Sequence, residues 1–299
     1  MANKAGFVTI LGRPNAGKST LLNALVGTKL AIVADKPQTT RTAIQGVLTL
    51  ENAQIVFVDT PGIHRSDTLL NRKMMQTVRA ALDGRDLVLF LADSTLPFTE
   101  ADREALGVLE HSRTPALLVL TKVDLLKKAE EVLPLIAKYK EVREFADYLP
   151  VSAVTGAGLD RLKEAIIERL PEGEPLYPED YLTDQPERFL AAELIREQVL
   201  KETRQEVPHA TAVWVDRWEE LGNLLRIAAT ILVEREGQKG IIIGSKGQML
   251  KKIGTAAREE MERFFGKKVF LELFVKVRPK WRENPEVLRE LDWHTMPGE

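Results

Sequence analysis

The sequence contains no cysteine among its 299 residues. Disulfide bonds and zinc sites built on thiolates are therefore excluded. It also lacks an unbroken run of about 18 apolar residues, the length that a membrane-spanning helix needs. The first residues lead from an apolar run straight into a glycine-rich loop and show no signal-peptide cleavage pattern. These absences predict a cytoplasmic protein.

A strong excess of either charge is also lacking, because 42 Lys and Arg residues stand against 44 Asp and Glu residues. One stretch departs from this balance. Residues 235–282 carry 13 Lys and Arg against 5 Asp and Glu, a local charge of +8. A surplus of this kind attracts a polyanion, although a run of charge is more often simply a solvated face. The charge alone leaves both interpretations open.

The chain is long enough for two hydrophobic cores. Residues 7–170 alternate short apolar runs with helical patterns. Strands are expected at 7–11, 43–50, 54–58, 87–92, 116–121 and 148–152, with helices near 18–27, 69–82, 100–110, 130–146 and 158–170. Several of the runs are apolar without alternation, as strands covered on both faces are. This alternation of strands and helices predicts a doubly wound, mostly parallel α/β sheet that binds ligands at the carboxyl ends of its strands.

The strongest motif lies at such a strand end. The sequence GRPNAGKS follows the first expected strand and precedes a helical stretch, which is the context of a P-loop. Its glycines let backbone amides turn toward phosphate oxygens, Lys18 adds a full charge, and Ser19 offers a hydroxyl to Mg²⁺. The expected phosphate-binding residues are Gly12, Arg13, Pro14, Asn15, Ala16, Gly17, Lys18 and Ser19.

Three shorter motifs follow in order at later strand ends. The first is DTPG, where Asp59 can hold Mg²⁺ and the Gly62 amide can meet a γ-phosphate. The second is TKVD, where the Asp124 carboxylate can accept hydrogen bonds from guanine but not from adenine. The third is VSAVTG, where the Ala153 amide faces the base. The expected nucleotide contacts are Asp59, Thr60, Pro61, Gly62, Ile63, Thr121, Lys122, Val123, Asp124, Ser152 and Ala153.

Together the four motifs resemble a translation-factor-class GTPase of the Era family. The resemblance implies binding of GTP, GDP and Mg²⁺, with a threonine of KPQTTR (36–41) closing over the metal and the γ-phosphate. We favour Thr40 over Thr39, and the alternative is that both cap a turn. The metal ligands are then Ser19, Thr40 and Asp59.

Two departures from common GTPase patterns bear on the chemistry. Ras-like enzymes place a glutamine after DxxG to orient water, and Ile63 stands there in this chain. Asn15 resembles an asparagine with which relatives hold K⁺ beside the phosphates, so we expect Lys18, Thr40, Gly62 and Asn15 to act in catalysis. Thr121 stands where guanine sites usually have asparagine, and Asp124 is expected to keep the selectivity for GTP.

Residues 171–187 contain four prolines, six acidic residues and no basic ones. Such a segment opposes both helix and sheet and predicts an extended, semi-rigid linker. The expected division is a GTPase domain at 1–170, a linker at 171–187 and a second domain at 188–299 that ends in a C-terminal tail.

The sequence of the second domain predicts helices and strands in the order α-β-β-α-α-β, with IIIGSKG joining the second and third helices. This order resembles an α+β type II KH domain, which clamps about four single-stranded nucleotides at a G-x-x-G loop. We expect Ile241, Ile242 and Ile243 in the core and Ile253 on the wall of the binding groove, while Trp281 and Trp293 pack in the fold or stack on bases. The expected RNA contacts are Lys239, Gly244, Ser245, Lys246, Gly247, Lys251, Lys252 and Arg258.

The Era resemblance extends along essentially the whole chain. It implies a monomeric switch of slow intrinsic turnover that binds the 3′ region of 16S ribosomal RNA, assists assembly of the 30S subunit and associates weakly with the inner membrane; no DNA partner is expected. Three alternatives stay open at this point: an RNA-binding assembly factor in which GTP is structural, a peripheral-membrane signalling GTPase, and a P-loop kinase or ATPase, which TKVD opposes.

Overall fold

The computed structural model describes residues 3–36, 38–63 and 68–293. Contacts between Cα atoms divide these residues into two units. The first unit takes in the described residues within 1–31, 40–66 and 73–184, and the second takes in those within 32–39, 67–72 and 185–299. The domain boundaries at 170 and 187 stay a prediction, since two short segments from the first half of the chain cluster with the second unit.

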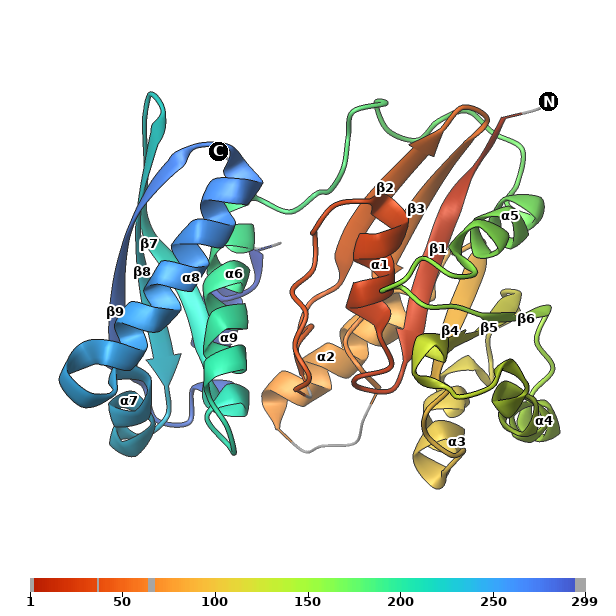
Figure 1. The fold of residues 1–299 in the computed structure, drawn as a ribbon, viewed down its shortest axis with the longest axis horizontal. Coiled ribbons are helices and arrows are strands. Elements are labelled where there is room, and N and C mark those ends of the chain that lie inside the picture. The colour runs from red at the N-terminus through yellow and green to blue at the C-terminus, as the bar shows by residue number, and fades with distance from the viewer. Residues whose placement is uncertain (1–2, 37, 64–67, 294–299) are drawn as a thin grey trace. The chain divides into compact units, whose positions relative to one another are not determined.

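A six-stranded sheet forms the centre of the first unit, in the order β2-β3-β1-β4-β5-β6 (Figure 1). Strand β2 is antiparallel to β3, and the other neighbours are parallel. The prediction of a doubly wound, mostly parallel sheet is confirmed. The strands are β1 (Lys4–Gly12), β2 (Ile44–Leu50), β3 (Ala53–Asp59), β4 (Leu87–Asp93), β5 (Ala116–Thr121) and β6 (Asp147–Pro150).

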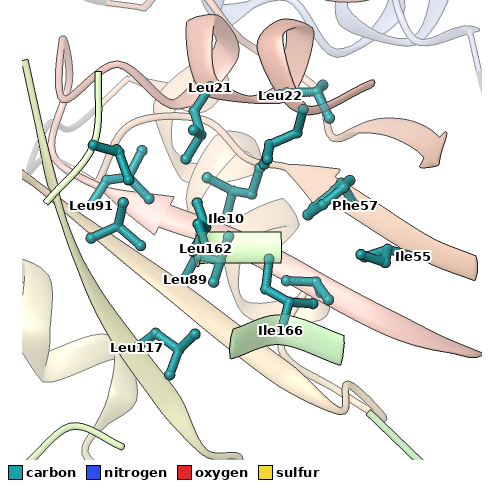
Figure 2. Close-up of a cluster of buried hydrophobic side chains, with 14 of the residues drawn as sticks. Ile10, Leu21, Leu22, Ile55, Phe57, Leu89, Leu91, Leu117, Leu162 and Ile166 are labelled. Carbon is teal, nitrogen blue, oxygen red and sulfur yellow. The ribbon is translucent and has the colours of Figure 1, made fainter. Parts of the chain in front are cut away.

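Alternate residues of the central strands point into two apolar layers on opposite faces of this sheet. In β4, Leu89 lies in one layer and Phe90 in the other. Figure 2 shows the first layer, where Leu22 and Ile166 from two helices meet side chains of β1, β3, β4 and β5. The helices are α1 (Lys18–Val26), α2 (Leu69–Ala80), α3 (Glu100–Leu106), α4 (Val132–Val142) and α5 (Leu159–Arg169).

The proline-rich segment after α5 is fixed along the edge of this sheet as far as residue 184. The Gln54 side chain accepts hydrogen bonds from the amides of Leu176 (2.7 Å) and Tyr177 (2.9 Å). Farther along, the Val47 amide of β2 donates to the carbonyl of Leu182 at 2.8 Å. Since β2 begins at Ile44, four residues after Thr40, this segment is attached to the strand that leads away from the expected metal-binding threonine.

The second unit contains a three-stranded sheet in the order β7-β8-β9, with β7 antiparallel and β9 parallel to β8. Helices α6 and α8 pack on one face of the sheet, so the predicted α-β-β-α-α-β order is confirmed. The elements are α6 (Glu187–Glu202), β7 (Ala212–Leu221), β8 (Leu224–Val233), α7 (Glu236–Ile243), α8 (Gln248–Phe265) and β9 (Lys268–Val277). A further helix that the sequence did not predict, α9 (Pro285–Glu290), begins where the Asn284 side chain accepts from two free amides.

Two expectations for this unit, those for Ile241 and Ile253, are wrong, and of the two alternatives for Trp281 and Trp293 the structure shows packing in the fold. Ile242 is fully buried, but Ile241 is 47% exposed and lies outside the core. Ile253 is fully buried beneath the sheet and not on a groove wall. Trp281 is fully buried and donates its indole N–H to the carbonyl of Ala210 at 2.8 Å. Trp293 packs 5.9 Å from the ring of Phe189, so neither tryptophan is presented to stack on bases.

The part of the chain that the structure describes contains no helix with both the length and the apolar character needed to cross a bilayer.

Candidate functional site

The phosphate loop connects β1 to α1 through backbone that favours glycine. Gly12 has φ of 149°, and a Cβ there would lie 2.6 Å from the carbonyl oxygen of Leu91. Gly17 has φ of 84° at the N-terminus of α1, and Asn15 also lies in the left-handed region with φ of 63°. The loop therefore needs glycine at positions 12 and 17, and the Asn15 side chain is exposed.

Lys18 is buried within this loop. Its ammonium donates to the carbonyls of Gly12 (3.2 Å) and Arg13 (2.8 Å), and only 6% of the residue is exposed. Burial lowers the pKa of Lys18 to about 8, while the negative charge of Asp59 acts in the opposite direction. A buried cation at the mouth of a glycine loop is suited to neutralising phosphate oxygens.

The side chain of Arg13 points away from the loop. Its guanidinium forms an ion pair with Asp102 at 2.8 Å and donates to the Thr99 hydroxyl at 3.1 Å. Asp102 also accepts from the Tyr139 hydroxyl at 2.8 Å. Only the backbone of Arg13 therefore belongs to the phosphate site, and its side chain fastens the loop to α3 and α4.

Three oxygen-bearing side chains converge beside Lys18. The Ser19 hydroxyl donates to Asp59 Oδ2 at 2.6 Å and lies 2.7 Å from the hydroxyl of Thr40. Thr40 is itself 3.4 Å from the same carboxylate oxygen. The Thr39 hydroxyl instead donates to the backbone carbonyls of residues 34 and 36. The geometry thus separates the two threonines and brings only Thr40 to the cluster.

The Asp59 carboxylate lies at the carboxyl end of β3 and is fully buried. Burial raises its pKa to about 6, against the opposing effects of the Lys18 charge and of hydrogen bonds from Ser19 and Thr40. A carboxylate held with two hydroxyls is the type of donor set that Mg²⁺ accepts, because this ion binds oxygen ligands and keeps several waters. The residues present therefore fit a magnesium ion.

The DTPG segment folds back onto the phosphate loop. A Cβ at Gly62 would lie 2.8 Å from the backbone of Pro14, so the two segments are in close contact there. The Ile63 amide donates to the carbonyl of Gly12 at 3.1 Å, while its side chain is only 8% exposed and packs in the apolar layer with α2, α3 and α4. Thr60 and Pro61 are buried. Ile63 contributes its backbone to the site and no catalytic side chain.

Thr121 joins the expected base site to the phosphate loop. Its hydroxyl donates to the carbonyl of Ala16 at 2.8 Å. Lys122 has φ of 60°, and its ammonium lies 2.6 Å from Asp93 Oδ2. Val123 and the exposed Asp124 belong to a short 3₁₀ helix that follows directly. Threonine at position 121 therefore holds this segment to the phosphate loop by a hydrogen bond.

The loop that carries Ser152 and Ala153 is ordered by its own hydrogen bonds. The Ser152 amide donates to the carbonyl of Ala157 at 2.9 Å, and its hydroxyl accepts from the amide of Thr155 at 3.1 Å. The Val123 amide donates to the carbonyl of Val151. This contact brings the loop beside the TKVD segment, as the base site requires.

In the second unit, the GSKG segment connects α7 to α8. Gly244 has φ of 70° and ψ of 178°, and a Cβ there would lie 2.7 Å from the Met249 side chain. Lys246 and Gly247 have φ of 50° and 78°, and a Cβ at Gly247 would meet open space. The two glycines thus differ: Gly244, at the end of α7, is packed against the first turn of α8, and Gly247 has open space where a Cβ would lie.

A groove of about 340 Å³ begins at Gly247 and runs between α8 and β9. On one side it is lined by residues of α8 that recur every three or four positions, and on the other side by two alternate leucines of β9. The lining residues are Gly247, Leu250, Lys251, Gly254, Thr255, Arg258, Leu271 and Leu273. The sequence interpretation missed Leu250, Gly254, Thr255, Leu271 and Leu273, although the helical spacing from Gly247 and the alternation of β9 were the available signals.

The predicted RNA-binding cations do not all lie in this groove. Lys251 and Arg258 line it, and Lys246 is exposed at its end. Lys252 points elsewhere, because its ammonium is 2.5 Å from Glu202. Lys239 is half-buried on α7. The groove itself combines an apolar floor with two cations along one helix.

Comparison with known proteins matches two separate parts of the chain to two family models. Residues 7–122 match the family model described as 50S ribosome-binding GTPase, and residues 206–282 match the KH domain model. A protein of Geobacter metallireducens named GTPase Era is 52% identical over 292 residues, which are 97% of this chain and 98% of that protein. The chain belongs to the Era family of GTPases. A second family member, from Syntrophus aciditrophicus, is 49% identical over 293 residues.

Solved structures of the family extend the likeness to the fold of the whole chain. One is an Era variant from Aquifex aeolicus bound to GDP·AlF4⁻, and another is an Era in complex with MgGDPNP and nucleotides 1506–1542 of 16S ribosomal RNA. Each is 43% identical, with a TM-score of 0.94 over 97% of this chain and 99% of that one.

Proposed function

We propose that this chain is a GTP-hydrolysing switch that binds single-stranded RNA near the 3′ end of 16S ribosomal RNA and assists assembly of the 30S subunit. The observation that carries the proposal is the convergence of the Ser19, Thr40 and Asp59 oxygens within 3.4 Å, beside the buried Lys18 ammonium. The relatives solved with GDP·AlF4⁻, and with MgGDPNP and 16S ribosomal RNA, support both halves of the proposal.

At the nucleotide site, Ser19, Thr40 and Asp59 would hold Mg²⁺, directly or through water. When bound, the ion neutralises charge on the β- and γ-phosphates. Lys18 would neutralise the same oxygens, the phosphate-loop amides would orient them, and the Gly62 amide would donate to the γ-phosphate. Asp124 and the amide of Ala153 would select guanine, within a segment that Thr121 fixes to the phosphate loop.

Selection of guanine is testable at Asp124. The Asp124→Asn variant should bind GTP more weakly and bind xanthosine triphosphate more tightly, because an amide donates to the xanthine oxygen where the carboxylate accepts from the guanine amine. Calorimetric affinities for the two nucleotides make the comparison. Unchanged GTP affinity in the variant would contradict the assignment.

Ile63 stands where Ras-like enzymes have the glutamine that orients water, and its buried apolar side chain cannot take that role. Asn15 supports the use of K⁺, because its exposed amide projects from the phosphate loop at a left-handed position. A monovalent cation there would stabilise charge that develops between the β- and γ-phosphates. GTP turnover should be faster in KCl than in NaCl, and Asn15→Ala should abolish the difference. Equal rates in the two salts would refute the role of Asn15.

At the RNA site, the exposed Lys246 and the half-buried Gly247, where a Cβ would meet open space, would let a sugar-phosphate backbone approach the loop, while bases lie on Leu250 and Leu273. Lys251 and Arg258 would add affinity that falls with salt. We propose that the chain acts as a monomer in the cytoplasm, with weak association to the inner membrane surface.

The function as a switch requires that RNA affinity depend on the nucleotide. We expect a single-stranded RNA from the 3′ end of 16S ribosomal RNA to bind with different affinity in the presence of GDPNP, of GDP and of no nucleotide, as measured by filter binding. Equal RNA affinities in all three conditions would refute the switch and would indicate that GTP has only a structural role. Crosslinking to RNA in cells provides the second test, and crosslinks that avoid the 3′ region would refute the partner.

A further inference from the structure

Asp102, in the first turn of α3, is a buried carboxylate outside the phosphate, metal and base sites. Its Oδ2 atom accepts from the Arg13 guanidinium at 2.8 Å, from the Thr99 amide at 2.9 Å and from the Thr99 hydroxyl at 2.7 Å. Its Oδ1 atom accepts from the Tyr139 hydroxyl at 2.8 Å. Burying a charge is costly unless it is paired and hydrogen-bonded, and this carboxylate meets both conditions. It is therefore a firm point of attachment for Arg13, the residue of the phosphate loop that it contacts.

Tyr139, on α4, holds the same carboxylate from its other side. Its ring is buried and lies 4.9 Å from the ring of Phe98 and 6.1 Å from the ring of Phe90. Burial, and after it the negative charge of Asp102, raises the pKa of Tyr139 above the ordinary value of a phenol, so the hydroxyl keeps its proton and donates. The packed ring and its hydrogen bond to a charged group thus fix Asp102 between α3 and α4.

The phosphate loop is fixed at its two ends by the sheet. Gly12 pairs with Leu91 in the register of β1 and β4, and the carbonyl of Ala16 accepts from the Thr121 hydroxyl at 2.8 Å. Between these ends the loop borders a small cavity of about 30 Å³, which Pro14 and Ala16 line from the side of the loop and side chains of α3 and α4 line from the opposite side. A void provides no contacts that oppose a small shift of the loop, so the position of residues 13–15 depends on the hydrogen bonds of the Arg13 side chain.

Pro14, the residue after Arg13, connects this attachment to the expected γ-phosphate site. A Cβ at Gly62 would lie 2.8 Å from the Cα atom of Pro14, so the backbones of these two residues are in close contact. The carbonyl of Arg13 also accepts from the Lys18 ammonium at 2.8 Å. A change in the position of Arg13 would therefore move both the surface against which Gly62 rests and an acceptor of the Lys18 cation.

We propose that Asp102 and Tyr139 are positioning residues for the γ-phosphate end of the nucleotide site: through Arg13 they hold Pro14 against Gly62. The inference rests on the proposed function, in which the Gly62 amide donates to the γ-phosphate. A diphosphate has no γ-phosphate to meet this amide. The attachment of Arg13 therefore contributes to the binding of a triphosphate and contributes much less to the binding of a diphosphate.

The test uses full-length Asp102→Asn and Tyr139→Phe, each with a matched control. Asp102→Asn keeps the shape of the side chain and removes its charge, and Glu100→Gln removes a charge from the same turn of α3 at an exposed site. Tyr139→Phe keeps the ring and removes the hydroxyl. Tyr148→Phe does the same beside the same apolar layer, where the lost hydroxyl accepts from the Phe145 amide and does not reach Asp102.

Fluorescence titration with N-methylanthraniloyl-labelled GDPNP and GDP, in the presence of Mg²⁺, gives the two affinities of each variant. We expect the affinity for GDPNP to fall about five- to tenfold in Asp102→Asn and about two- to threefold in Tyr139→Phe, part of the effect of a lost hydrogen bond to a charged group. GDP affinity should stay close to wild type, and both controls should match wild type for both nucleotides. The ratio of the two affinities is the readout, because a general loss of thermal stability does not change it.

An Arg13→Gln background separates action through Arg13 from a direct effect. If Asp102 acts through Arg13, Asp102→Asn should lower the ratio of GDPNP to GDP affinity no further once Arg13 is replaced, because both changes break the same path. An equal loss in both backgrounds would overturn the inference, as would an unchanged ratio in every variant that folds. Equal losses of GDPNP and GDP affinity would reduce Asp102 and Tyr139 to structural residues and also overturn it. Failure of the wild type to bind GDPNP would instead refute the proposed function.

Discussion

The two glycines of the GSKG loop should fail in different ways when each is replaced by alanine. Gly247 has φ of 78° and ψ of 10°, and a Cβ there would meet open space. The left-handed conformation alone costs a residue with a Cβ about 1 kcal/mol. Gly244 has φ of 70° and ψ of 178°, a region nearly restricted to glycine, and its Cβ would also lie 3.0 Å from the Met249 amide nitrogen. Strain and overlap together should cost about 3 kcal/mol or more.

A matched control is available at the other end of α8. Gly266 has φ of 65° and ψ of 12°, and a Cβ there would also meet open space. Gly266→Ala should therefore lose about as much stability as Gly247→Ala, near 1 kcal/mol. The two substitutions differ in their place relative to the groove: Gly247 lines the groove between α8 and β9, and Gly266 does not.

The assay is urea denaturation of the full chain together with titration of a fluorescent single-stranded RNA. Gly247→Ala should bind RNA about tenfold more weakly, since a methyl group would occupy the space that sugar-phosphate needs, and tenfold corresponds to about 1.4 kcal/mol. Gly266→Ala should bind RNA as wild type does. Equal RNA affinities for these two variants would refute close backbone approach at the loop. A Gly244→Ala variant as stable as Gly247→Ala would refute the packing of Met249 against Gly244.

Three further results are expected. Lys251→Gln should reduce the slope of log K against log salt by about 0.7 for single-stranded RNA, while Lys252→Gln should change it less because its ammonium is already paired at 2.5 Å; equal changes would contradict the groove assignment. Trp281→Phe should cost about 1–3 kcal/mol in urea unfolding, since the carbonyl of Ala210 loses its buried donor, and RNA affinity should not change; a loss of RNA binding at full stability would point to base stacking instead. In the absence of nucleotide, folding lowers the pKa of Lys18 from 10.5 to about 8. Between these pH values the unfolded chain binds more protons than the folded chain, so the free energy of unfolding rises with pH. Lys18→Met should remove this rise, and an identical pH dependence of stability in wild type and variant would refute the burial of the charge.

Local patterns were enough to predict most elements of both units. Apolar runs without alternation gave the buried strands, and the spacing of GRPNAGKS placed the phosphate loop between a strand and a helix. Helix α9 was not predicted because it is only six residues long, and its sequence signal is an asparagine cap and not an amphipathic pattern. Ile241 was misplaced because an apolar run gives no phase within a short helix, whose exposed face is decided by the neighbours of α7.

The sequence by itself determined the two-part organisation, the nucleotide motifs and the family, because each depends on residue types at short spacing. Tertiary structure alone decided which threonine meets Ser19 and Asp59, since Thr39 and Thr40 are chemically equivalent neighbours and differ only in where the backbone directs them. It also decided that the groove wall is made by Leu271 and Leu273 rather than Ile253, and that Arg196 and Glu197 bind residues about 160 positions earlier in the chain. Periodicity carries no information about contacts across such a separation, because they depend on how whole elements pack.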